Sequence, residues 1–298
     1  MATATDEPPT SGRTPSGPDR LRPAEWLAVF KQTFRQFLAD DCMGLSQQIA
    51  YSSLLAFFPA VVFLVAVLGL IGAYDTLQSF LTPVAPESVR NLIEQLQRDS
   101  TGGGSAVAAV FGAFGALWAG SGAMGSLVKA VNRAYERLET RPFWRVRLVS
   151  LVLLLASGLV LAGMLLLIVF GGKLGDAIAR RADVSGAFTW FWEVLRWPIA
   201  FAAVLLLFAL IYYLAPNKEE RSWKWLTPGS LVGSLTWLAL SGLFALYTAF
   251  SSSYSRTYGS LAGGIVLLLW LNYSAWAVLF GAELNAELDR RARAPESP

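Results

Sequence analysis

The sequence contains no histidine and only one cysteine, Cys42. Without histidine the commonest general base and metal ligand is missing, and a lone cysteine cannot form an intrachain disulfide. The sequence also has no Cys/His metal spacing, no glycine-rich nucleotide loop and no nucleophile elbow. We therefore predict a protein that is not an enzyme and that has no metal site and no cofactor.

Charged residues are scarce as well. They make up 15% of the chain, against about 25% in a typical soluble domain, while hydrophobic residues make up 54%. The net charge is +3, but the Lys and Arg residues are spread over short segments between apolar runs and do not gather in one basic domain. This distribution predicts a polytopic membrane protein whose first partner is the lipid bilayer, and no nucleic-acid partner.

The apolar runs predict an all-α bundle of six transmembrane helices, because each run is long enough to cross a hydrocarbon core of about 30 Å. The spans are expected at about 46–72, 105–128, 148–170, 198–214, 228–250 and 261–282, within a membrane domain covering 23–288. Residues 1–22 are rich in Pro, Gly, Ser and Thr and are predicted to form a disordered tail. Residues 289–298 are predicted to form a C-terminal tail.

Two short amphipathic helices are expected beside the spans. In 26–38, apolar residues recur at helical spacing with Lys31 and Arg35 between them, which is typical of a helix on lipid headgroups. A solvated helix packed on the bundle explains the same pattern equally well. In 86–97, Val89, Leu92, Ile93 and Leu96 predict a second such helix on the outer surface.

Proline and glycine predict local features of the spans. Pro59 removes a hydrogen bond inside span one and should kink it, and Pro198 is expected at the first position of span four, after a polar segment 173–196. Span two carries rows of small residues that include Gly112 and Gly120, which let helix backbones approach closely. We expect span two to have neighbours on two sides and to be the most enclosed helix.

The stretch 254–288, YSRTYGSLAGGIVLLLWLNYSAWAVLFGAELNAEL, combines a polar beginning, an apolar span and an acidic end. With 49–70, 131–151 and 212–233, it resembles the YihY/BrkB family of bacterial inner-membrane proteins, whose signature runs YGSLAG, an apolar helix and GAELNA. The resemblance covers almost everything after about residue 40, and it implies a six-span protein of the inner membrane. It leaves the biochemical activity to be argued from residues.

The basic residues predict the orientation of the spans. They are concentrated in the N-terminal tail, in 129–147, in 216–227 and in the C-terminal tail, which all lie on one side of a six-span chain. Cytoplasmic segments are enriched in Lys and Arg, so both termini are expected in the cytoplasm.

Polar residues inside spans are costly and are therefore candidate functional sites. Our candidates for a substrate path are Gln48, Tyr51, Ser52, Asn272, Tyr273 and Glu283, with Pro59, Gly112 and Gly120 in structural roles. Spans one and six hold most of these groups, so we expect them to meet, with Gln48, Tyr51 or Ser52 facing the stripe from Asn272 to Glu283. A hydrogen-bond network that only fixes helix packing is the simpler use of any one member.

A pair of glutamates closes span six, because Glu283 and Glu287 lie one helical turn apart. Asp40 and Asp41 are expected at a similar depth near span one, and carboxyl pairs can run acid/base chemistry when burial separates their pKa values. Arg290, Arg291 and Arg293 follow directly, and ordinary ion pairing on the helix face is expected to account for both glutamates.

Two functions fit these features. The first is a transporter or translocator of a small solute or lipid, indicated by the polar residues within spans, the Pro59 kink and six spans divisible into two halves of three. The second is a non-transporting membrane scaffold in envelope assembly or stress resistance. A homo-oligomer and an envelope protein partner both stay open.

Overall fold

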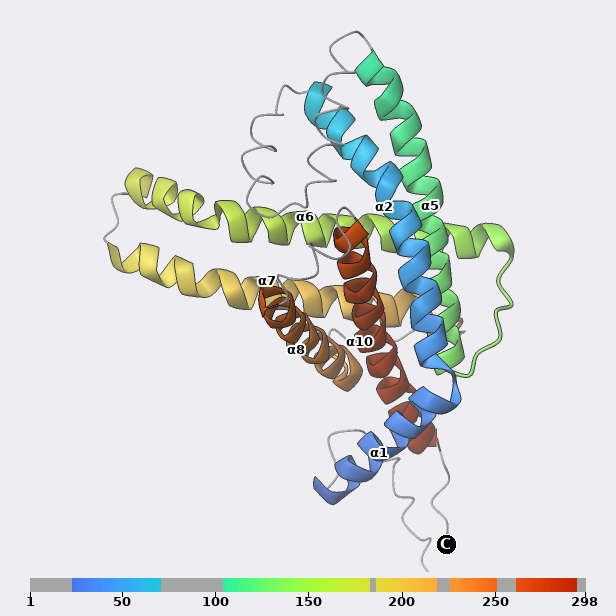
Figure 1. Cartoon of the computed structure of the whole chain (residues 1–298). Helices are drawn as coiled ribbons and strands as arrows, with labels where there is room; N and C mark the ends of the chain where they lie inside the picture. Colours follow the sequence, from blue (N-terminus) through green and yellow to red (C-terminus); the bar gives the residue numbers. More distant parts are fainter. Residues whose placement is uncertain (1–22, 71–103, 183–185, 219–225, 251–260, 294–298) are drawn as a thin grey trace, which may run out of the picture.

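The computed structural model describes residues 23–70, 104–182, 186–218, 226–250 and 261–293 (Figure 1). Every regular element within these ranges is an α-helix. The helices are α1 (Pro23–Ala39), α2 (Cys42–Leu70), α5 (Gly104–Ala134), α6 (Phe143–Ala182), α7 (Gly186–Leu214), α8 (Pro228–Phe250) and α10 (Leu261–Arg293). The predicted tail at 1–22 and the predicted helix at 86–97 lie outside the described residues.

Six of the helices are long and apolar enough to cross a membrane. Even the shortest of them, α8, has 23 residues and is therefore about 35 Å long, more than the hydrocarbon core requires. The predicted all-α architecture with six spans is confirmed.

Several helix bounds differ from those predicted. The helix α6 has 40 residues and runs to Ala182, because alanine, leucine, lysine and arginine sustain the helix beyond the apolar span. Pro198 lies inside α7 and does not begin it, since a proline in a membrane helix is tolerated when its surroundings satisfy the freed carbonyl. The segment 186–196 is accordingly helical, and α10 continues through the first residues of the predicted tail to Arg293.

The helices are arranged around α10, which packs against α1, α2, α5 and α8. The helices α2 and α5 lie side by side, and α6 and α7 form a second pair that crosses them steeply (Figure 1). The buried share of the α10 span is 33%, against 28% for α5. The prediction that span two is the most enclosed helix is therefore wrong, and span six has that position.

The small-residue rows of α5 do place it against two neighbours. A Cβ on Gly112 would lie 2.9 Å from the backbone nitrogen of Phe63 in α2, and one on Gly120 would lie 2.8 Å from Leu154 in α6. Pro59 of α2 lies against the other row of small residues, because its Cβ would lie 3.2 Å from a Cβ on Gly115. The remaining side of α5 explains its lower burial, because its large apolar residues Val110, Phe111, Phe114 and Trp118 are exposed.

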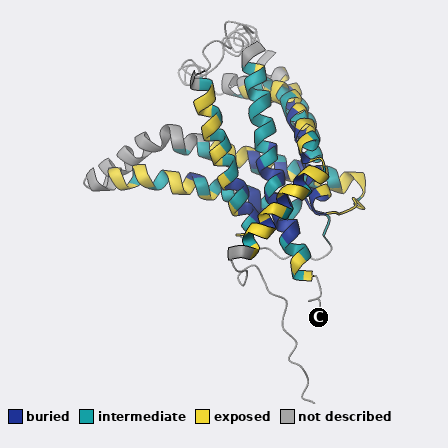
Figure 2. Cartoon of the chain, turned by 60° about the horizontal axis from the view of Figure 1, so that its bottom comes forward, coloured by how far each residue is buried: buried dark blue, intermediate teal, exposed yellow. Residues whose placement is uncertain are grey.

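The core lies at one end of the bundle, where buried residues concentrate (Figure 2). At this end the α1–α2 turn, the C-terminal part of α10 and the described segments 130–145, 214–218 and 226–230 meet. Ion pairs join these parts, including Arg133 to Asp40, Lys218 to Asp289 and Arg290 to Glu136. We refer to this end as the charged end.

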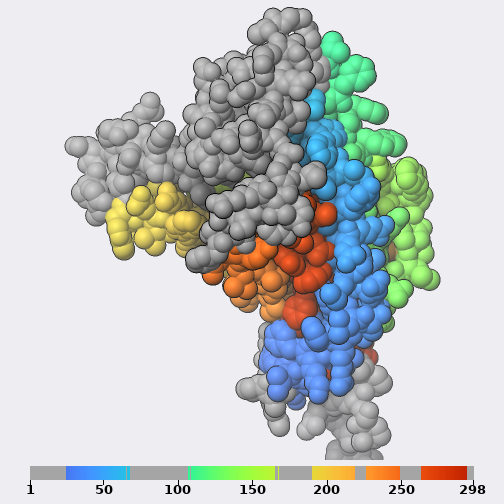
Figure 3. All heavy atoms as spheres, in the orientation of Figure 1, coloured from blue at the N-terminus to red at the C-terminus, as the bar shows by residue number. Residues whose placement is uncertain are grey.

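The helix α1 packs across the C-terminal part of α10 at the charged end (Figure 3). One side of α1 buries Val29, Thr33 and Phe37. The other side exposes Leu27 and Phe34, by 74% and 56%. The helix α1 therefore packs on the bundle, as the second interpretation requires, and its placement on lipid headgroups stays a prediction.

Candidate functional site

The GAELNAEL segment lies in α10 at the charged end, and each of its polar side chains has a different environment. Glu287 is ion-paired to Arg291 at 2.7 Å and to Arg290 at 3.1 Å. Asn285 accepts a hydrogen bond from the backbone N–H of Gly229 at 2.9 Å and donates one to the Thr227 hydroxyl at 3.1 Å. Asn285 thereby satisfies a free N–H group at the start of α8 and joins α8 to α10.

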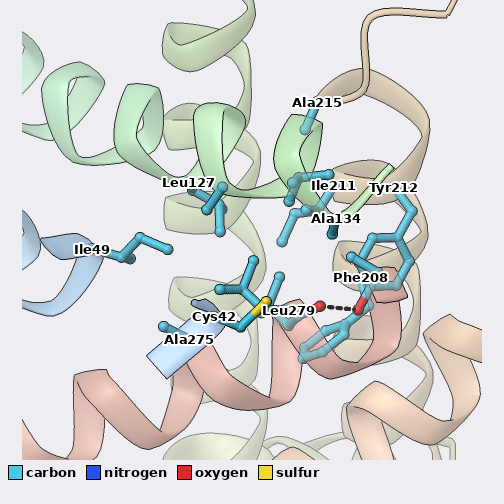
Figure 4. Packing of buried hydrophobic residues seen from close by; sticks show 14 of the residues in the cluster. Cys42, Ile49, Leu127, Ala134, Phe208, Ile211, Tyr212, Ala215, Ala275 and Leu279 are labelled. Atoms are coloured by element: carbon cyan, nitrogen blue, oxygen red, sulfur yellow. Dashed lines mark hydrogen bonds between the residues drawn. The ribbon is translucent and has the colours of Figure 1, made fainter. Parts of the chain in front are cut away.

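Gly281 permits this contact between α8 and α10. A Cβ at Gly281 would lie 2.5 Å from the backbone oxygen of Gly229 and would collide with the Tyr212 hydroxyl. That hydroxyl donates a hydrogen bond of 2.8 Å to the carbonyl of Val278 (Figure 4). The glycines therefore let α8 and α10 meet at backbone distance and leave room for the Tyr212 side chain of α7.

Glu283 is fully buried and differs from Glu287 in its partners. Its Oε1 accepts a hydrogen bond from Cys42 Sγ at 3.6 Å, and its Oε2 has no hydrogen-bond donor within the described residues. The side chain of Cys42 points from the start of α2 toward α10 (Figure 4). The expected helix-face ion pairing is confirmed for Glu287 and wrong for Glu283, because the Glu283 side chain turns into the core toward α2.

A second polar cluster joins the loop after α5 to the end of α7. Asn132 donates to Glu139 at 2.8 Å and accepts from the backbone N–H of Asn217 at 2.7 Å. Arg141 forms an ion pair with Glu139 at 2.6 Å and donates to the carbonyls of Leu214 and Ala215, which end α7. Hydrogen bonds from Arg141 hold the pKa of Glu139 below its ordinary value.

The predicted residues of α2 do not face α10 as a group. Gln48 is exposed, and the Tyr51 side chain is 60% exposed. Ser52 shares a hydrogen bond of 3.3 Å with Ser126 of α5. Spans one and six do meet, as expected, but the described polar contact between them is made by Cys42 and Glu283.

The predicted residues of α10 lie on sides of the helix that face its neighbours in the bundle. The Oδ1 atom of Asn272 is buried without a hydrogen-bond partner in the described chain, and so is Nε1 of Trp276, one turn further on. Tyr273 packs its ring against Phe244 of α8 and Trp276, with centroids 5.9 Å and 5.1 Å apart. Asn272, Trp276 and Glu283 share one side of α10, because their spacings of four and seven residues match the helical repeat.

A small pocket opens at the charged end, with a volume of about 50 Å³. Its lining includes Tyr135, Arg137, Lys218 and Arg293 and contains none of the six predicted path residues. Burial and the nearby Asp289 carboxylate raise the pKa of the Tyr135 phenol, and Lys218 Nζ lies 4.2 Å from the centre of that ring.

Sequence reasoning missed the residues that join the helices at the charged end. Cys42, Asn132, Arg141, Tyr212 and Asn285 are the main ones. Four of them lie within the stretches that carry the family resemblance, and this was the available signal. Their partners, however, lie far away in the chain, so no spacing rule could pair them.

Comparisons with known proteins find relatives that match most of the chain. The family model described as virulence factor BrkB matches residues 33–298. YfkH of Bacillus subtilis (strain 168), whose name describes it as ribonuclease-like, is 30% identical over 91% of this chain and 98% of its own length. A UPF0761 membrane protein of Chromohalobacter salexigens is 29% identical over 92% of this chain and 67% of its own. No solved structure matches the chain.

Proposed function

The chain belongs to the virulence factor BrkB family, and its relatives include membrane proteins. From this premise we propose that it moves a small solute or a lipid across the bilayer. In this proposal α10 lines the path. Its polar side chains contact the substrate while the helices around it change their packing.

One observation carries the proposal, namely the stripe of Asn272, Trp276 and Glu283 on α10. Each of these side chains has a buried polar atom with no hydrogen-bond partner in the described residues. A buried polar group without a partner costs about 1–3 kcal/mol, and water cannot reach it in a packed apolar bundle. For Asn272 and Trp276, which lie within the span, a transported molecule or the water of a path explains the free polar atoms more easily than helix packing does.

The second candidate is a non-transporting scaffold in envelope assembly or stress resistance. It is favoured by the exposed apolar side of α1, which a protein partner or a second copy of the chain could cover. It is also favoured by the pocket at the charged end, because none of its lining residues belongs to the stripe.

We also propose that the protein lies in the bacterial inner membrane with both termini in the cytoplasm. The charged end gathers the basic segment 129–147, Lys218 and Arg290–Arg293, and an excess of Lys and Arg marks the cytoplasmic side. The charged end would then face the cytoplasm.

We further propose that the protein is not an enzyme, although the name of its relative YfkH includes the term ribonuclease-like. Acid/base cleavage of RNA usually uses histidine, and the sequence has none. The stripe on α10 lies within an apolar helix, where a folded RNA could not reach it.

A density map of the purified protein in a lipid nanodisc tests the transport proposal. We expect density for a lipid or solute beside Asn272 and Trp276 in the wild type and its loss in Asn272→Leu, because the leucine removes the polar contact and has nearly the same size as asparagine. Leu243→Ala is a matched control, since Leu243 is 64% exposed on α8. A dry, fully packed stripe in the wild type would favour the scaffold.

A further inference from the structure

The turn between α1 and α2 brings a second carboxyl group to Glu283. Asp40 lies in this turn with a side chain that is only 13% exposed, and its carboxyl is within hydrogen-bonding reach of Glu283. We refer to Asp40 and Glu283 as the carboxyl pair. The pair joins the α1–α2 turn to the most buried helix of the bundle.

Four carboxyl oxygens belong to the pair, and two of them have donors. Asp40 Oδ1 accepts from Arg133 Nε at 3.2 Å, and Glu283 Oε1 accepts from Cys42 Sγ. The other two, Asp40 Oδ2 and Glu283 Oε2, are buried and have no donor among the described residues. Two ionised carboxylates cannot donate to each other, so one proton between these oxygens would satisfy both.

The neighbouring charges decide which carboxyl holds this proton. Asp40 forms an ion pair with Arg133 at 3.2 Å, whereas Glu283 is fully buried and its described side-chain donor is the Cys42 thiol. Asp41 adds negative charge near Cys42. Two further groups lie within electrostatic range of Glu283, namely Arg290 on α10 and Tyr135 directly after α5. The helix α8, which also packs against α10, contains no charged residue.

We propose that the carboxyl pair is a proton-binding site, in which Glu283 Oε2 carries the proton and donates it to Asp40 Oδ2. If the proposed transport function holds, this proton is the ion whose binding and release are coupled to movement of the substrate. On release, the proton passes to water at the charged end and leaves two carboxylates. No bond between heavy atoms forms or breaks.

The position of the pair explains how proton release changes the packing. Asp40 belongs to a tight turn in which Asp41 has a φ of 54°, a conformation that few non-glycine residues adopt. The turn is followed at once by α2, whose first residue contacts Glu283. Two adjacent negative charges repel each other in a poorly hydrated site, so release pushes the α1–α2 turn away from α10.

The test is the apparent unfolding midpoint of the protein in nanodiscs between about pH 6 and about pH 9. We expect the wild-type midpoint to fall by about 4 °C or more over this range, because loss of the shared proton leaves two buried charges. Glu283→Gln and Asp40→Asn should each show less than half of this fall, since an amide N–H donates to the remaining carboxylate without needing a proton.

Glu287→Gln is the matched control, because Glu287 is a buried glutamate on the same helix with arginine partners. It should keep the wild-type fall. Asn272→Leu should keep it too, so a failure of the transport proposal would leave this result unchanged. Two results would overturn the proton-binding site. One is a wild-type midpoint that does not change with pH, and the other is a fall in Glu283→Gln and Asp40→Asn as large as that of the wild type.

Discussion

Replacing Gly281 or Gly229 by alanine is expected to lower the apparent unfolding midpoint by roughly 6–12 °C, from an overpacking cost of about 3 kcal/mol. A Cβ on Gly229 would collide with the backbone oxygen of Gly281 and lie 2.5 Å from the Asn285 side chain. A backbone oxygen in a helix cannot move aside as the end of a flexible side chain can. The helices α8 and α10 would therefore have to separate, with loss of the Asn285 hydrogen bonds.

Gly242→Ala in α8 and Gly264→Ala in α10 are the matched controls, because a Cβ at either position meets no atom within 4 Å. Both variants should have the unfolding midpoint of the wild type or be more stable by up to about 1 kcal/mol, since alanine favours a helix more than glycine does. Thermal unfolding of all four variants in one detergent checks the prediction. Equal midpoints for Gly281→Ala and Gly264→Ala would show that α8 and α10 are not in backbone contact.

Replacing Arg141 by alanine is expected to cost about 2–3 kcal/mol. Its side chain is 9% exposed and is the partner of both Glu139 and the carbonyls of Leu214 and Ala215, so its removal leaves Glu139 without a cationic partner and two carbonyls without their donor. Arg141→Lys should recover only part of this loss, because an ammonium cannot reproduce the guanidinium fork. Arg145→Ala is the control, since Arg145 lies over the Trp144 ring in an exposed position.

The same contact predicts a pH dependence. The pKa of Glu139 is lowered in the folded protein, so its ion pair stabilises the fold above the ordinary value of 4.5 and this stabilisation is lost as the pH falls below it. The difference in midpoint between wild type and Glu139→Gln should therefore shrink as the pH is lowered below that value. A difference that grows in acid would contradict the assignment of Arg141 as the main partner.

The spans could be predicted from the sequence because long apolar runs have few other uses. The bounds were less predictable. Pro198 follows the rule for a first helical residue, yet neighbouring structure lets α7 run through it. The small-residue rows of α5 correctly indicated close packing on two sides, but they said nothing of its third side, where Phe111 and Trp118 are exposed.

The candidate site was predictable along one helix and not between helices. The spacing from Asn272 to Glu283 defines a stripe on α10 without knowledge of the fold. The contact of Glu283 with Cys42 spans 241 residues of sequence and depends on how α2 and α10 cross. Gln48 and Tyr51 seemed the natural partners by polarity, but the rotation of α2 exposes them and turns Cys42 inward.

The claim that the α10 stripe borders a water-accessible path is tested most directly by cysteine labelling in membranes. Cys42 is the only native cysteine, so Asn272→Cys in a Cys42→Ser background offers a single thiol. Arg145→Cys at the charged end serves as the accessible control and Leu153→Cys, which is fully buried in α6, as the inaccessible one. The account predicts that a membrane-impermeant thiol reagent modifies the cysteine at 272 but not the one at 153. Protection of both thiols from either side of the membrane, with the cysteine at 145 modified, would contradict it.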